Sequence, residues 1–134
     1  NINMSNKMDK ILAEISAGEL IDKITILEIK KEKIVSKDKI LEINKELISL
    51  NETMKKHIPN QATIKNFKDD LKNINLKLWD IEDGKRLAEK NNLFDDNFIK
   101  LARNVYKFND ERARLKLEIN KVLGSNIKEV KSYD

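Results

Sequence analysis

Residues 101–122 read LARNVYKFNDERARLKLEINKV, and this stretch decides the fold prediction. Its apolar residues recur at spacings of three and four, which is typical of a helix packed along one seam: Leu101, Val105, Phe108, Leu115, Ile119 and Val122. Arg112 falls on that seam, and Asn109, Lys116 and Asn120 run beside it. A half-buried guanidinium is costly unless something pairs with it. We therefore expect this helix to face a partner, a ligand or an internal polar network.

Two further helices are predicted upstream of this one. A seam spaced 3-4-3-4-3 indicates a coiled-coil-like helix over about residues 63–89: Ile64, Phe67, Leu71, Ile74, Leu78 and Ile81. Two apolar repeats of seven residues favour a longer helix, packed on two sides, over about residues 16–56: Leu20, Leu27, Ile34, Leu41 and Ile48, then Ile26, Ile40, Leu47 and Met54. Within that helix, Ser36-Lys37-Asp38 is the expected place for a bend or break.

Residues that commonly begin and end helices lie at the ends of the predicted helices. Ser16-Ala17-Gly18-Glu19 reads as a capping box, with Ser16 at the N-cap and Glu19 reaching back. The other expected caps and stops are Pro59, Asn60 or Thr63, Asn91-Asn92, Asp95 or Asp96, and Gly124.

We therefore predict an all-α fold with helices at about 16–56, 63–89 and 95–123. Two short loops between long helices imply antiparallel neighbours, so the expected architecture is an elongated antiparallel three-helix bundle or coiled coil. Residues 16–124 form the single domain. Residues 1–15 are an N-terminal arm, of which 1–3 precede Met4 as a cloning remnant would, and residues 125–134 are a C-terminal tail. The second apolar face of the first helix needs cover, and a homodimer is the simplest cover.

The composition limits the classes of function. The chain has 134 residues and a net charge of +4, but acidic residues interleave with the lysines, which argues against nucleic-acid binding. The absence of Cys excludes disulfides and thiolate chemistry, and a lone histidine, His57, argues against a metal site. No apolar run has the length of a membrane span, and no secretory signal is present, so we expect a cytoplasmic protein. No catalytic residue, metal or cofactor is predicted.

Polar residues on the seams have two interpretations. Folding the hairpins about their loops brings Asn44, Asn75, Asn109 and Arg112 to one level, and such a layer commonly fixes the register of a bundle. Alternatively, an inter-helix site holds a small carboxylate or phosphate, clamped by Arg112 and Lys116. The candidate ligand-binding residues of that site are Arg112, Lys116, Asn109, Asn120, Tyr106, Trp79, Glu82, Arg86 and Lys23. For Trp79 and Tyr106, ordinary packing is the competing interpretation.

One stretch carries a family resemblance. Residues 16–30, SAGELIDKITILEIK, resemble the opening signature of an uncharacterised bacterial helical family, a domain of unknown function. Later pieces are similar too, from Leu78-Trp79-Asp80-Ile81-Glu82 to the closing Lys131-Ser132-Tyr133, so the resemblance covers about residues 11–133. It implies a stand-alone helical domain and transfers no catalytic residue.

A looser likeness is to the all-helical chorismate mutases, carried by Phe94-Asp95-Asp96-Asn97-Phe98-Ile99 at the start of the last helix. It implies a dimer that grips a dicarboxylate. The chain departs from that pattern, because an early arginine is absent from the first helix, where Lys23 or Lys30 would substitute, and Lys116 or Asn120 replaces the closing Gln.

The sequence thus predicts a helical interaction or assembly domain that self-associates, with a possible protein partner. The first alternative is a small-anion binder or a chorismate-mutase-like enzyme, and the second is nucleic-acid binding.

Overall fold

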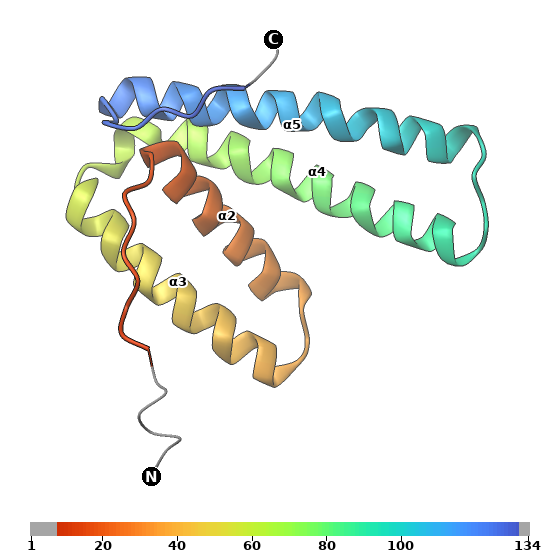
Figure 1. Ribbon diagram of the computed structural model, residues 1–134, viewed down its shortest axis with the longest axis horizontal. Helices are drawn as coiled ribbons and strands as arrows, with labels where there is room; N and C mark the ends of the chain where they lie inside the picture. Colours follow the sequence, from red (N-terminus) through yellow and green to blue (C-terminus); the bar gives the residue numbers. More distant parts are fainter. Residues whose placement is uncertain (1–7, 132–134) are drawn as a thin grey trace.

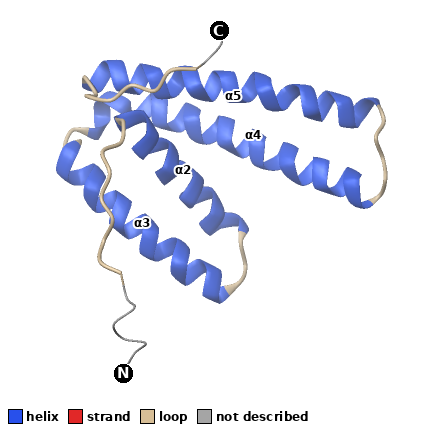
Figure 2. Ribbon diagram, in the orientation of Figure 1, coloured by secondary structure: helices blue, strands red, loops and turns tan. Residues whose placement is uncertain are grey.

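The structure, a computed structural model, describes residues 8–131. The regular elements in that range are all helical, as predicted (Figure 2): α2 (Ala17–Lys33), α3 (Lys37–His57), the 3-10 turn η1 (Gln61–Ile64), α4 (Lys65–Lys90) and α5 (Asp96–Leu123). The expected remnant at residues 1–3, the start of the arm and the end of the tail lie outside the described residues.

The helix expected over residues 16–56 is two helices. α2 ends at Lys33, Ile34 is extended, and the Ser36 hydroxyl accepts a hydrogen bond from the Lys39 amide at 3.5 Å to cap α3. The break thus falls beside the predicted Ser36-Lys37-Asp38 segment. The three-helix bundle is not confirmed, because residues 8–131 contain four α-helices.

The four helices form two hairpins that diverge from a common end (Figure 1). α4 and α5 lie side by side, and their far end extends beyond the rest of the molecule. α2 is the central helix, since it packs against α3 on one side and against α4 and α5 on the other. The two apolar faces read from the sequence are therefore used by α2 within one chain.

The core lies where the two hairpins meet. Ile21 and Ile24 of α2, Leu71 of α4 and Ile119 of α5 are completely enclosed. α3 adds a buried stripe to the same core: Ile43, Leu47 and Met54. The apolar face for which a homodimer was the simplest cover is thus covered in part by folding α3 back on α2, while Leu41 and Ile48 of α3 stay exposed.

Several predicted caps are confirmed. The Asp95 carboxylate accepts from the Phe98 amide at 3.1 Å at the start of α5, and Gly124 ends that helix with a positive φ of 61°. Residues 8–15 form an exposed, non-helical arm, and the tail from Ser125 runs back alongside α5 (Figure 1). Asn60 caps η1, which precedes α4.

Candidate functional site

A buried ion pair joins the first and last helices. Asp22 of α2 is fully enclosed, and its carboxylate accepts two hydrogen bonds from Arg112 of α5, at 2.9 Å from Nε and 2.5 Å from Nη2. Such two-point pairing is the strongest geometry available to a guanidinium and a carboxylate. The hydrogen bond to Asp22 raises the pKa of Arg112 above its usual range, so this side chain stays protonated.

Three further polar side chains complete the network around Asp22. The Asn75 amide nitrogen on α4 donates to Asp22 Oδ1 and to Thr25 Oγ1, each at 3.0 Å, and the Thr25 hydroxyl donates to the Asp22 carbonyl oxygen at 2.8 Å. The Asn109 oxygen accepts from Arg112 Nη1 at 3.4 Å. A buried carboxylate is tolerable only when it is paired and hydrogen-bonded, and here α4 and α5 supply the partners of the Asp22 carboxylate.

A second polar cluster anchors the start of α2 to α5 and the tail. The Ser16 hydroxyl caps α2 by accepting from the Glu19 amide at 3.0 Å, and it donates to Glu129 of the tail at 2.6 Å. Lys116 lies between two carboxylates, at 2.5 Å from Glu19 and 3.1 Å from Glu129. Burial lowers the pKa of Lys116, but the hydrogen bonds to Glu19 and Glu129 outweigh burial, and the net direction is upward.

The close approach of α2 and α5 at this cluster requires a glycine. The Gly18 amide donates to the Asn120 side-chain oxygen at 2.6 Å, and a Cβ at Gly18 would collide with the Lys116 carbonyl oxygen. The N-cap role of Ser16 is confirmed. The expected return of the Glu19 carboxylate to the N-cap is not found among residues 8–131, since Glu19 turns to Lys116 instead.

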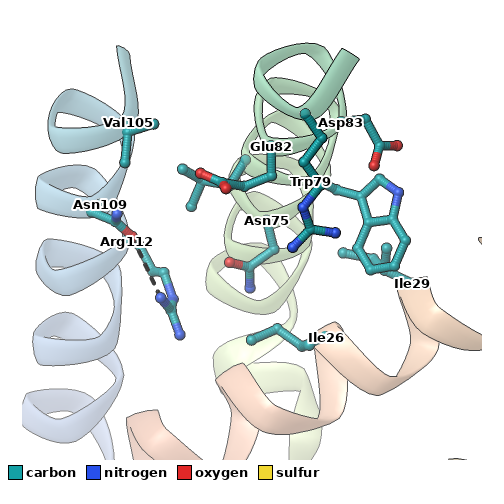
Figure 3. A pocket seen from close by; sticks show the side chains of 11 residues that line it. Ile26, Ile29, Asn75, Trp79, Glu82, Asp83, Val105, Asn109 and Arg112 are labelled. Atoms are coloured by element: carbon teal, nitrogen blue, oxygen red, sulfur yellow. Dashed lines mark hydrogen bonds between the residues drawn. The ribbon is translucent and has the colours of Figure 1, made fainter. Parts of the chain in front are cut away.

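A cleft of about 330 Å³ opens beside the Asp22 network, where α2 diverges from α4 and α5. Figure 3 shows Arg112 and Asn109 on α5, Asn75, Trp79 and Glu82 on α4, and Ile26 on α2 around it. The lining residues come from three helices: Ile26, Ile29, Asn75, Leu78, Trp79, Glu82, Asp83, Arg86, Val105, Asn109 and Arg112.

The structure divides the predicted ligand-binding residues between these places. Five of them line the cleft: Trp79, Glu82, Arg86, Asn109 and Arg112. Lys116 and Asn120 belong to the second cluster, and Lys23 lies at its edge, 3.7 Å from Glu19. Tyr106 is exposed and is not among the cleft-lining residues, so it supplies no wall there. The expected polar layer also changes, because Asn75, Asn109 and Arg112 belong to one network whereas Asn44 makes no hydrogen bond with the described residues.

The predicted ligand-binding residues do not include Asp22 or Thr25, which the structure places in the buried network. The sequence does contain an indication of their role. Asp22, Thr25 and Ile29 are spaced by three and four residues, so two polar side chains lie on the same helix face as an isoleucine. Polar residues on an otherwise apolar helix face call for partners, and Arg112 is the matching partner.

No helix among residues 8–131 has the length and apolar character needed to cross a membrane.

Comparisons with known proteins identify the family of the chain. No curated protein and no solved structure matches the chain. A family of unknown function (DUF6165) matches residues 11–134, nearly the range over which the sequence resembled an uncharacterised domain family. The chain therefore belongs to the DUF6165 family.

Proposed function

We propose that this chain is a helical interaction domain that self-associates through the free end of the α4–α5 hairpin. The observation that carries the proposal is a set of large apolar side chains at that end, each more than half exposed: Leu87, Leu93, Phe94 and Ile99. We call these four residues the tip patch. Exposed apolar groups gathered in one place are typical of interaction surfaces.

The shape of the hairpin supports a partner at the tip patch. The far halves of α4 and α5 extend beyond α2 and α3, so only these two helices cover each other there (Figure 1). Two such hairpins that meet around a two-fold axis would form a four-helix arrangement, a common way for helical hairpins to bury apolar side chains.

The charge of the tip also suits self-association. Residues 82–103 contain five acidic and five basic side chains, whereas the whole chain carries +4. Two identical surfaces without net charge do not repel each other, and a net charge near zero promotes association.

The small-anion alternative draws less support from the geometry. Arg112 and Lys116, the two expected clamps, already hold Asp22, Glu19 and Glu129. An anion would have to displace a carboxylate from either cation before it could bind there. The cytoplasmic location and the bacterial origin expected from the sequence stay predictions.

The test is the molecular mass in solution, measured by sedimentation equilibrium across a range of concentrations. We expect wild type to form dimers, and we expect Leu87→Glu and Phe94→Glu each to give monomers with unchanged helical circular dichroism. Ile48→Glu is the matched control, because Ile48 is also an exposed apolar residue but lies on α3. A monomeric wild type at about 100 µM, or a dimer lost in Ile48→Glu and kept in both tip variants, would overturn the proposal.

A further inference from the structure

The cleft between α2, α4 and α5 combines an apolar wall with polar groups that lack partners. Its wall is built from branched and aromatic side chains of all three helices: Ile26, Ile29, Leu78, Trp79 and Val105. The volume of about 330 Å³ falls within the range of small-molecule sites, which are typically apolar clefts with a few placed polar groups.

At the base of the cleft, the charges are balanced but hydrogen-bonding capacity remains. Arg112 and Asp22 neutralise each other, and three of the five N–H groups of Arg112 are used by Asp22 and Asn109. The Asn75 side-chain oxygen accepts no hydrogen bond from the described residues. Every fully enclosed side-chain oxygen in residues 8–131 has a hydrogen-bond partner. The Asn75 oxygen has none, so it is not fully enclosed, and we infer that it opens to the cleft that Asn75 lines.

The rim of the cleft carries one unpaired charge of each sign. Asp83 and Arg86 both line the cleft, and neither makes an ion pair or a hydrogen bond within residues 8–131. The third rim charge, Glu82, is 3.5 Å from Lys85 and so has a cationic neighbour of its own. In Figure 3, Asp83 lies above the Trp79 ring, and Glu82 points toward α5.

From this arrangement we propose that the cleft binds a small zwitterion with an apolar body, of the α-amino acid class. The ligand carboxylate pairs with Arg86, its ammonium group pairs with Asp83, and its side chain packs against Trp79 and Ile26. The inference is independent of self-association, because the tip patch and the cleft share no residue.

The charge balance favours a zwitterion over a simple ion. Two of the charges beside the cleft are already compensated, because Arg112 pairs with Asp22 and Glu82 lies 3.5 Å from Lys85. The two rim charges without a partner among the described residues are Asp83 and Arg86, one of each sign. A plain anion would leave Asp83 uncompensated, and a plain cation would leave Arg86 uncompensated. A ligand with both charges leaves neither rim group unpaired.

The single tryptophan of the chain makes the test direct, because Trp79 is the only indole and it lines the cleft. Its fluorescence is followed while wild-type protein is titrated with leucine, with 4-methylpentanoate, which lacks the ammonium group, and with 3-methylbutylamine, which lacks the carboxylate. Glycine supplies both charges without an apolar body. We expect a saturable change with leucine at a concentration at least tenfold lower than with any of the other three compounds.

Matched variants connect the signal to the rim charges. We expect Arg86→Gln and Asp83→Asn each to raise the half-saturating leucine concentration at least tenfold, measured by fluorescence and by titration calorimetry. Arg103→Gln and Asp80→Asn, which change exposed charges outside the cleft, should leave it unchanged. Equal saturation by 4-methylpentanoate and leucine, no saturation by leucine, or retention of wild-type affinity in both rim variants would each overturn the proposal.

Discussion

The Asp22–Arg112 pair allows a quantitative prediction. Arg112→Leu removes the guanidinium and leaves the fully enclosed Asp22 carboxylate with the Asn75 amide as its one remaining side-chain donor. Removing one partner of a buried ion pair typically costs about 3–5 kcal/mol, because the other charge stays buried without compensation. The Arg112 side chain is 30% exposed, so water can reach part of the vacated space. We therefore expect the lower end, about 3 kcal/mol.

The assay is urea unfolding at one fixed protein concentration, which keeps any contribution from self-association constant. For a chain of this length a loss of about 3 kcal/mol corresponds to a fall in Tm of roughly 10 °C. Arg114→Leu is the matched control, since Arg114 lies on the same helix but pairs with exposed Glu111 at the surface. We expect its free energy of unfolding in urea to change little.

The double variant Asp22→Leu/Arg112→Leu tests whether the two side chains depend on each other energetically. Replacing a whole buried pair by apolar side chains is often close to neutral, so the double variant should be less destabilised than the two single losses added together, by about 2 kcal/mol or more. Additive losses, or a loss below about 1 kcal/mol for Arg112→Leu, would refute the claim that the pair is buried and mutually dependent.

Two further predictions concern the contact between α2, α5 and the tail. Gly18→Ala should lower the unfolding free energy by about 1–3 kcal/mol, because its methyl group meets the Lys116 carbonyl; Gly84→Ala, next to a flexible leucine, should cost less in the same denaturation assay. Burial raises the pKa of the Glu129 carboxyl, but its hydrogen bonds to Ser16 and Lys116 outweigh burial and hold the pKa below the usual value of 4.5. The contribution of Glu129 to stability is therefore fully present above about pH 4.5. It is lost as the pH falls through the lowered pKa of the folded state. Glu129→Gln should thus be less stable than wild type at pH 7, with the gap closing as the pH falls below 4.5, and a gap independent of pH would contradict this assignment.

The apolar pattern predicted the helices but could not locate the turn between α2 and α3. Leu27, Ile34 and Leu41 keep a seven-residue spacing across the break, so the repeat by itself is the same for one long helix and for two. Two other features favour the break. The Ser36 hydroxyl caps the second helix, and folding back buries Leu47 in the core. That burial depends on tertiary contacts, which a local pattern does not contain.

The candidate site was predictable on α4 and α5 and much less so on α2. Arg112 stood out because it interrupts an apolar seam, but its partner Asp22 is 90 residues away in the sequence. A spacing rule cannot connect residues at such a separation when the helix boundaries between them are uncertain. Lys116 was assigned to an anion for the same reason, since its carboxylate partners lie on α2 and on the tail.

The buried network and the open cleft have a common physical origin. Where α2 crosses α4 and α5, Gly18 allows the backbones to approach closely, and the Asp22 network satisfies the polar groups at the crossing. Helices that cross at an angle separate on either side of the contact, so the next turns of α2, at Ile26 and Ile29, cannot fill the space beside Trp79. An ion pair at the crossing point also favours this register over neighbouring ones, because sliding α2 by one turn would leave Asp22 buried without Arg112. The same residues that fix the crossing therefore also determine how much space stays open beside Trp79.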